Sequence, residues 1–189
     1  MSWFQVSIKP VDARKHASPA EILECFRNEN SLLRKLAFLV TGDLALADQS
    51  VAKARESTLK GNAPFRDWLL EWAKSLTVNS AIASTAEGIR ACDAIYRVRH
   101  CTHIELLWLG DDDRTASLNQ VLQADPQRLI AELDPLCRAI LVLRVAIRSS
   151  IQDCVLRLNV SRTAVLAGHC QAITWLYDLQ LPRGDSSRH

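Results

Sequence analysis

The residue types that could bind a metal ion gather in the middle of the chain. His100, Cys101 and His103 are close in sequence, with Cys92 nearby, and imidazole and thiolate are ligands that zinc prefers. Zinc-binding sequences usually carry two such clusters and this one carries a single cluster, so packed or solvated side chains are the favoured interpretation. The acidic run 111–113 lacks the spaced ligands and the glycine of a calcium loop. We therefore predict no metal site.

Motifs for catalysis are absent from the sequence. The chain has no nucleophile elbow, phosphate-binding loop, HExxH motif or dinucleotide fingerprint. We predict no catalytic residue and no cofactor, and expect that the protein is not an enzyme. Trp68 and Trp72 are one helical turn apart and could stack on nucleic-acid bases. Their alignment with Phe65, Leu69 and Leu76 favours at least one of the two tryptophans as a core residue.

The composition is typical of a helical protein. The chain has 189 residues, is 48% hydrophobic and contains six glycines and six prolines, enough for one medium core or two small ones. Runs rich in valine and isoleucine are few, which argues against a large sheet. The net charge of +2 indicates no general attraction to a polyanion.

Apolar runs are too short for a signal peptide or a membrane span of ~20 residues. We therefore expect a cytoplasmic protein with no membrane contact. The six cysteines include no CxxC pair, and most have apolar neighbours. We expect reduced, buried thiols.

Helix-start signals and apolar spacing predict three antiparallel helices in the first half. Ser18, Pro19 and Glu21 provide a cap, a first-turn proline and a carboxylate that reaches back to the cap. Apolar residues then recur at helical spacing until Gly42 ends the helix. A second helix is predicted to follow up to residue 60.

The third helix is predicted to begin at Asn62, which can cap it, and to carry a heavy apolar stripe to Leu76. A weaker pattern predicts another helix over residues 84–110. An acidic stretch, residues 111–125, is then predicted to be a linker.

The last third of the chain carries the signals of a helix-turn-helix. Asp-Pro pairs at 125–126 and 134–135 begin two helices. A serine at 149 or 150 caps a short third helix, which Asn159 can end in the left-handed conformation. Ser161 caps a longer fourth helix. The last two elements have helix-turn-helix geometry, with an ordinary helical hairpin as the alternative.

Together these signals predict an all-α fold of two small helical domains in tandem, the second with a helix-turn-helix. The predicted organisation is an N-terminal arm (1–17), a helical domain (18–110), an acidic linker (111–125), a helix-turn-helix domain (126–181) and a disordered tail (182–189).

Two stretches resemble a known family, in the family's own order. Residues 41–43 (TGD), 47–48 (AD), Phe65, 68–69 (WL) and 73–74 (AK) resemble region two of the extracytoplasmic-function (ECF) sigma factors of bacterial RNA polymerase. The stretch from Leu133 to Val165 is similar to region four of the same family. In that family, region two binds the polymerase clamp and reads the melted promoter, while region four reads the upstream promoter element.

The resemblance implies a divergent sigma-factor-like protein in transcription initiation. The partners it implies are core RNA polymerase, promoter DNA and, for regulation, a protein such as an anti-sigma factor. Polymerase-binding positions carried over from the family are Asp48, Gln49, Val51 and Arg55. DNA-binding positions are Trp68, Lys74, Arg162, Thr163 and Gln171.

Basic residues are scarce where this family contacts DNA. No Lys or Arg occurs from Ser75 to Ile89, or between Arg162 and Arg183, and each phosphate contact needs a cation. One acidic residue and the Gln of the family's clamp-facing helix are also missing. We expect weak DNA binding by the protein alone.

The alternative hypothesis is a protein interaction module that keeps the sigma scaffold and has lost DNA binding. A sheet, or a single fused bundle with residues 160–176 sealed inside, would overturn the sigma interpretation.

Overall fold

The structure, a computed structural model, describes residues 15–96 and 126–180. Within those two ranges the chain forms α-helices and one short 3-10 helix, with no strand beyond an isolated bridge between His16 and Phe65. The predicted all-α class is confirmed. The predicted linker and tail, and most of the predicted arm, lie outside the described residues.

The first half of the chain forms six helical elements before the gap. They are α1 (Pro19–Asn28), α2 (Asn30–Thr41), α3 (Leu44–Lys60), η1 (Arg66–Trp68) and α4 (Leu69–Ser84), followed by α5 (Ala86–Tyr96). The predicted capping box at Ser18 is present, with the Glu21 backbone N–H bonded to the serine hydroxyl and the Glu21 carboxylate bonded to the Ser18 N–H. Gly42 ends α2 in the left-handed conformation, at a φ of 71°.

One predicted helix is divided in the structure. The chain from Ser18 to Gly42 forms α1 and α2, which meet at Glu29 with φ −95° and ψ 9°. The residues around this break are polar, so no apolar side chain favours a straight helix there. The change of direction allows Phe26 and Leu33 to enter the same hydrophobic cluster.

After the gap the chain forms α7 (Pro126–Glu132), α8 (Pro135–Val145), α9 (Ile151–Leu158) and α10 (Arg162–Gln180). Asp134 caps α8 by accepting from the Cys137 N–H at 2.9 Å. Ser150 caps α9, and Asn159 ends it at φ 52° and ψ 49°. The predicted signals at Asp134, Ser150 and Asn159 are confirmed, whereas the predicted cap at Asp125 lies outside the described residues.

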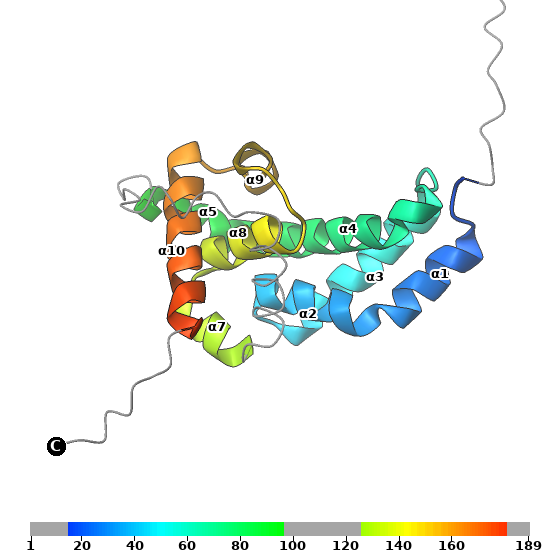
Figure 1. The fold of residues 1–189 in the computed structure, drawn as a ribbon, viewed down its shortest axis with the longest axis horizontal. Coiled ribbons are helices and arrows are strands. Elements are labelled where there is room, and N and C mark those ends of the chain that lie inside the picture. Colours follow the sequence, from blue (N-terminus) through cyan, green and yellow to red (C-terminus); the bar gives the residue numbers. More distant parts are fainter. Residues whose placement is uncertain (1–14, 97–125, 181–189) are drawn as a thin grey trace, which may run out of the picture.

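Two hydrophobic clusters form the interior. The end core lies among α1, α2, α3 and the start of α4 and contains Ala17, Ile22, Phe26, Leu33, Val51, Ala54, Leu69 and Ala73. The main core joins α2–α5 to α7–α10 through residues such as Leu39, Ile89, Ile140 and Ile173. The main core is therefore continuous across the point where the sequence placed a linker. In Figure 1, α1 and α10 lie at opposite ends of the molecule, with α4 between them.

α8 is the central helix of the main core. Every residue from Leu136 to Val145 is buried, as expected of a helix that packs on all sides. Its two arginines are buried too, and they donate to backbone carbonyls: Arg138 to Leu133 at 2.9 Å and Arg144 to Ser149 at 2.5 Å. α8 packs against α2, α5, α9 and α10, so it holds the two halves of the chain together.

Candidate functional site

The predicted polymerase-binding residues lie on α3, and three of the four are exposed. Asp48, Gln49 and Arg55 face solvent. Arg34 of α2 holds Asp48 with two hydrogen bonds, from Nε to Oδ1 at 2.5 Å and from Nη2 to Oδ2 at 3.1 Å. An exposed ion pair contributes only about 0–1 kcal/mol. Its main effect is to fix the carboxylate relative to both helices.

Val51 has a different position from its predicted partners on α3. Its side chain is 8% exposed and belongs to the end core. In this structure Val51 therefore anchors α3 and presents almost no surface to a partner.

The turn before α3 sets which residues of that helix face solvent. Asp43 caps α3 by accepting from the Leu46 N–H at 2.9 Å. Gly42 is required there because its φ is +71° and because a Cβ would lie 3.3 Å from Nη2 of Arg138 on α8. The TGD sequence thus positions α3 and contacts the second half of the chain.

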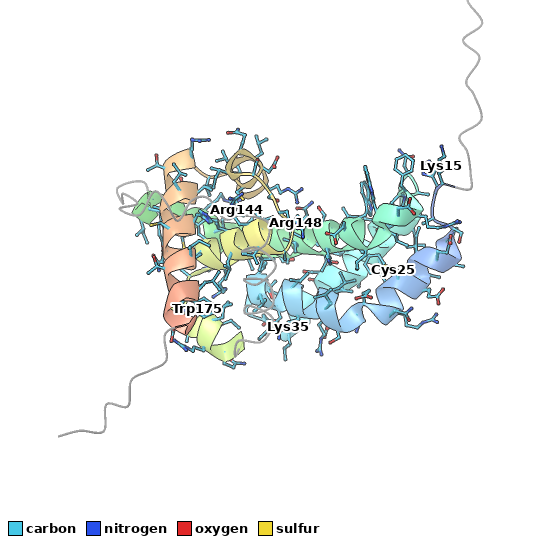
Figure 2. All side chains as sticks on the ribbon, in the orientation of Figure 1. Lys15, Cys25, Lys35, Arg144, Arg148 and Trp175 are labelled. Atoms are coloured by element: carbon cyan, nitrogen blue, oxygen red, sulfur yellow. The ribbon has the colours of Figure 1, made fainter. Side chains whose placement is uncertain are left out.

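An exposed aromatic group, the aromatic edge, lies where η1 meets α4. It consists of His16, Phe65, Trp68 and Trp72. His16 stacks on Phe65 with ring centroids 4.6 Å apart, and Trp68 meets Phe65 edge-on at 5.9 Å. Figure 2 labels Lys15 beside this edge, at the end of the molecule away from Trp175 on α10.

The prediction that at least one tryptophan would be a core residue is wrong. Trp68 is 68% exposed and Trp72 is 45% exposed. The predicted helix from Asn62 begins instead at Leu69, after the 3-10 helix. Leu69 and Ala73 then form the inward face of α4, which leaves both indoles outside.

Two of the cations near the aromatic edge are paired with carboxylates, whereas the exposed Lys15 forms no ion pair with the described residues. Lys74 is bonded to Glu71 at 2.7 Å, and only 13% of its side chain is exposed. Arg66 is bonded to Glu21 at 2.8 Å. The edge offers stacking surfaces with little net positive charge for a nucleic-acid backbone.

α9 and α10 are the two helices of the predicted helix-turn-helix, but only the first turn of α10 is open. Arg162 and Thr163 are exposed. The predicted DNA contact Gln171 is half-buried, and its Oε1 lies 2.6 Å from the Tyr96 hydroxyl of α5. His169 is fully buried. Most side chains from Val160 to Leu176 are buried: Val160, Ala164, Val165, Ala167, His169, Cys170, Ala172, Ile173, Trp175 and Leu176.

The N-terminus of α10 is bonded to α5. The backbone N–H and the hydroxyl of Ser161 both donate to Oδ1 of Asp93, each at 2.9 Å, and Asp93 is buried. A carboxylate at a helix N-terminus is favourable because the helix dipole is positive there. This contact is absent from the sequence predictions, because nothing in the local pattern links residues so far apart in the chain.

A polar group inside the main core joins α5, α8 and α10. The Tyr96 hydroxyl lies 2.5 Å from Oδ2 of Asp134 and 3.1 Å from Sγ of Cys137, in addition to its contact with Gln171. Burial and the Asp134 hydrogen bond raise the pKa of Tyr96 well above its usual value. Burial and the Asp134 charge raise the pKa of Cys137 to about 12. The Tyr96 hydroxyl and the Cys137 thiol stay protonated near neutral pH. This polar group therefore links the three helices and offers no nucleophile.

The cysteines that the structure describes are free thiols, as predicted, except at one position. Cys25, Cys92, Cys137 and Cys154 are free, and burial raises the pKa of each. Cys170 on α10 is disulfide-bonded, so the prediction of reduced thiols is wrong for this residue.

Within the described ranges, no group of three or more His, Cys, Asp or Glu side chains could hold a metal ion. His100, Cys101, His103 and the acidic run 111–113 lie outside those ranges. None of the described helices combines the length and the apolar character needed to cross a bilayer.

Comparison of the chain with protein-family models, curated proteins and solved structures gives no match.

Proposed function

We propose that this protein is a divergent sigma-like factor that docks on core RNA polymerase through the exposed face of α3. The observation that supports it is the pairing of Asp48 with Arg34, which holds a carboxylate rigidly beside the exposed Gln49 and Arg55. The turn at residues 41–43 (TGD), which resembles the family's sequence, sets which side of α3 faces solvent. A rigid face of mixed charge is suited to a specific protein partner, because opposite charges across an interface select partner and orientation.

We propose that contact with promoter DNA contributes less to this function than binding to polymerase does. The exposed Trp68 can stack on a base, and Arg162 and Thr163 can reach a groove. Lys74 and Gln171 are already bonded to other residues of the protein. DNA contact is therefore expected mainly within the polymerase complex, where polymerase supplies most of the affinity.

Copurification of the intact chain with core RNA polymerase tests the proposal. The charge reversal Arg55→Glu should weaken binding about tenfold, which corresponds to about 1.4 kcal/mol. Arg27→Glu on α1 is the matched control, because Arg27 is also exposed and lies on another helix. Failure of the wild-type chain to bind core polymerase at micromolar concentration would refute the proposal.

A second candidate function is a protein interaction module that keeps this scaffold without contacting DNA. The burial of α10 beyond its first turn favours it, since a reading helix must expose side chains to a groove. Promoter-directed transcription by the reconstituted polymerase separates the two. A sigma-like factor directs transcription from specific promoters, and Arg162→Glu reduces it without loss of polymerase binding. An interaction module binds polymerase or a regulator and directs no transcription.

A further inference from the structure

A cleft of about 370 Å³ lies where α9 meets α4 and α5. Its walls come from the consecutive helices α4 and α5 and from α9, which is far from both in sequence. The residues lining it are Asn79, Ile82, Ala83, Ala86, Arg90, Arg157, Leu158 and Asn159. The cleft is separate from the exposed face of α3 and from the aromatic edge.

Two arginines line this cleft, and neither is paired with a carboxylate of the described residues. Arg157 of α9 donates from Nη1 to the Ser75 hydroxyl and to Oδ1 of Asn79, both at 3.1 Å. These acceptors are neutral, so they orient the guanidinium without cancelling its charge. Arg90 of α5 is exposed and forms no ion pair within the described parts of the chain. Other cations of the protein, such as Arg34 and Arg66, do have carboxylate partners.

The acidic residues on the neighbouring turns do not line the cleft. Asp93 is bonded to Ser161, and the Asp153 carboxylate is bonded to Ser150 in the cap of α9. Glu87 lies one turn before Arg90 and is the remaining carboxylate on these turns. The lining itself therefore has two positive charges and no negative charge.

The rest of the lining suits an organic anion. Asn159 stands at the end of α9 in the left-handed conformation, and its carboxamide, like that of Asn79, can donate or accept hydrogen bonds. Ile82 and Leu158 supply apolar walls. Small-molecule sites combine apolar walls with a few convergent polar groups and measure about 300–1,000 Å³, so this cleft is at the small end of that range.

We propose that the cleft binds a small phosphate-bearing molecule of about mononucleotide size, with its phosphate between Arg90 and Arg157. Guanidinium groups bind phosphate oxygens with two parallel, charge-assisted hydrogen bonds. A bound phosphate would join α5 to α9 and would stabilise the packing of the two halves of the chain, because a ligand that binds the folded state raises its stability. This inference does not depend on the proposed function.

Titration of the full chain with AMP, inorganic phosphate and an unrelated DNA duplex tests the proposal, with calorimetry for binding and thermal melting for stability. AMP should bind with a stoichiometry of one and raise the melting temperature. Arg90→Gln and Arg157→Gln should each weaken AMP binding at least about tenfold, since each removes a charge-assisted hydrogen bond to the phosphate. The control Arg27→Gln should bind AMP like the wild type.

Arg90→Gln is the decisive variant, because Arg90 forms no hydrogen bond or ion pair with the described residues that its loss would break. Binding of the DNA duplex alone, weakened by both variants, would assign the phosphate to a nucleic-acid backbone and overturn the small-molecule proposal. Failure of all three probes to bind would overturn it as well. AMP binding that neither Arg90→Gln nor Arg157→Gln weakens would also overturn the proposal.

Discussion

α3 and α10 are both long helices, but their surroundings are opposite. α3 lies at the surface, where Asp48, Gln49 and Arg55 form a solvent-facing stripe. α10 packs against α5, α8 and α9, and beyond Thr163 most of its described side chains are buried. The comparison teaches that a helix that lacks basic residues is better explained by its packing than by a role in reading DNA.

The first prediction contrasts a buried position on α10 with an exposed position on α3, and it has the largest expected effect. Ile173→Ala on α10 removes a side chain that is 1% exposed in the main core and should lower the free energy of unfolding by about 2–5 kcal/mol. Leu44→Ala on α3 removes an exposed leucine and should change it by about 0.5 kcal/mol or less. Urea unfolding measures both. Similar values for the two variants would mean that α10 is not packed as described.

The second prediction applies one substitution to both helices. Asp93→Ala removes the buried acceptor of the Ser161 N–H and hydroxyl at the start of α10 and should cost about 1–3 kcal/mol of stability. Asp48→Ala removes an exposed partner of Arg34 and should cost no more than about 1 kcal/mol. Thermal and urea unfolding of the two variants give the comparison. Equal costs would show that the bond to α5 does not hold α10 in solution.

The third prediction uses pH to probe the main core. Cys137 and Cys154 are buried, and desolvation raises the pKa of each thiol to about 12, from 9.0 in the unfolded chain. The unfolded thiols lose their protons first as the pH rises, so their contribution to stability is complete below pH 9.0 and is lost between 9.0 and about 12. The decline should approach about 1.4 kcal/mol per pH unit for each thiol.

Urea unfolding from pH 7 to pH 10.5 measures this decline. The double variant Cys137→Ala, Cys154→Ala should flatten it, whereas Cys25→Ala, which removes a half-buried thiol from beside the end core, should change it less. A decline that the double variant leaves intact would place its origin in other groups.

Local signals in the sequence were sufficient for several helix ends, but they missed the break at Glu29 and the start of α4 at Leu69. Ser18, Asp134, Ser150 and Asn159 act as the caps and stops that their residue types indicated, because capping depends on neighbours within four residues. The position of Val51 was also readable. Its spacing from Ala47, Ala54 and Thr58 marks the inward face of α3, and that periodicity was a better guide to its burial than the resemblance to a family.

Contacts between distant segments could not be predicted from the local pattern. The Asp93–Ser161 bond, the Tyr96 polar group and the Arg157 contact with α4 each join residues from different helices. The tryptophans were misplaced because a 3-10 helix before α4 changed the phase of the apolar stripe. Such outcomes depend on tertiary packing, which overrides local preference.

The last prediction concerns the one part of α10 that resembles α3 in being exposed, its first turn. Arg162→Gln should lower the slope of log affinity against log salt for DNA binding by about one, since one phosphate contact is lost. Fluorescence anisotropy of the intact protein on duplex DNA over a range of salt concentrations measures the slope, with Arg27→Gln as the control. The affinity change should be small, because Arg162 is the only Arg or Lys on α10. An unchanged slope would mean that this turn does not contact phosphate, and the interaction module without DNA binding would then be the better description of the protein.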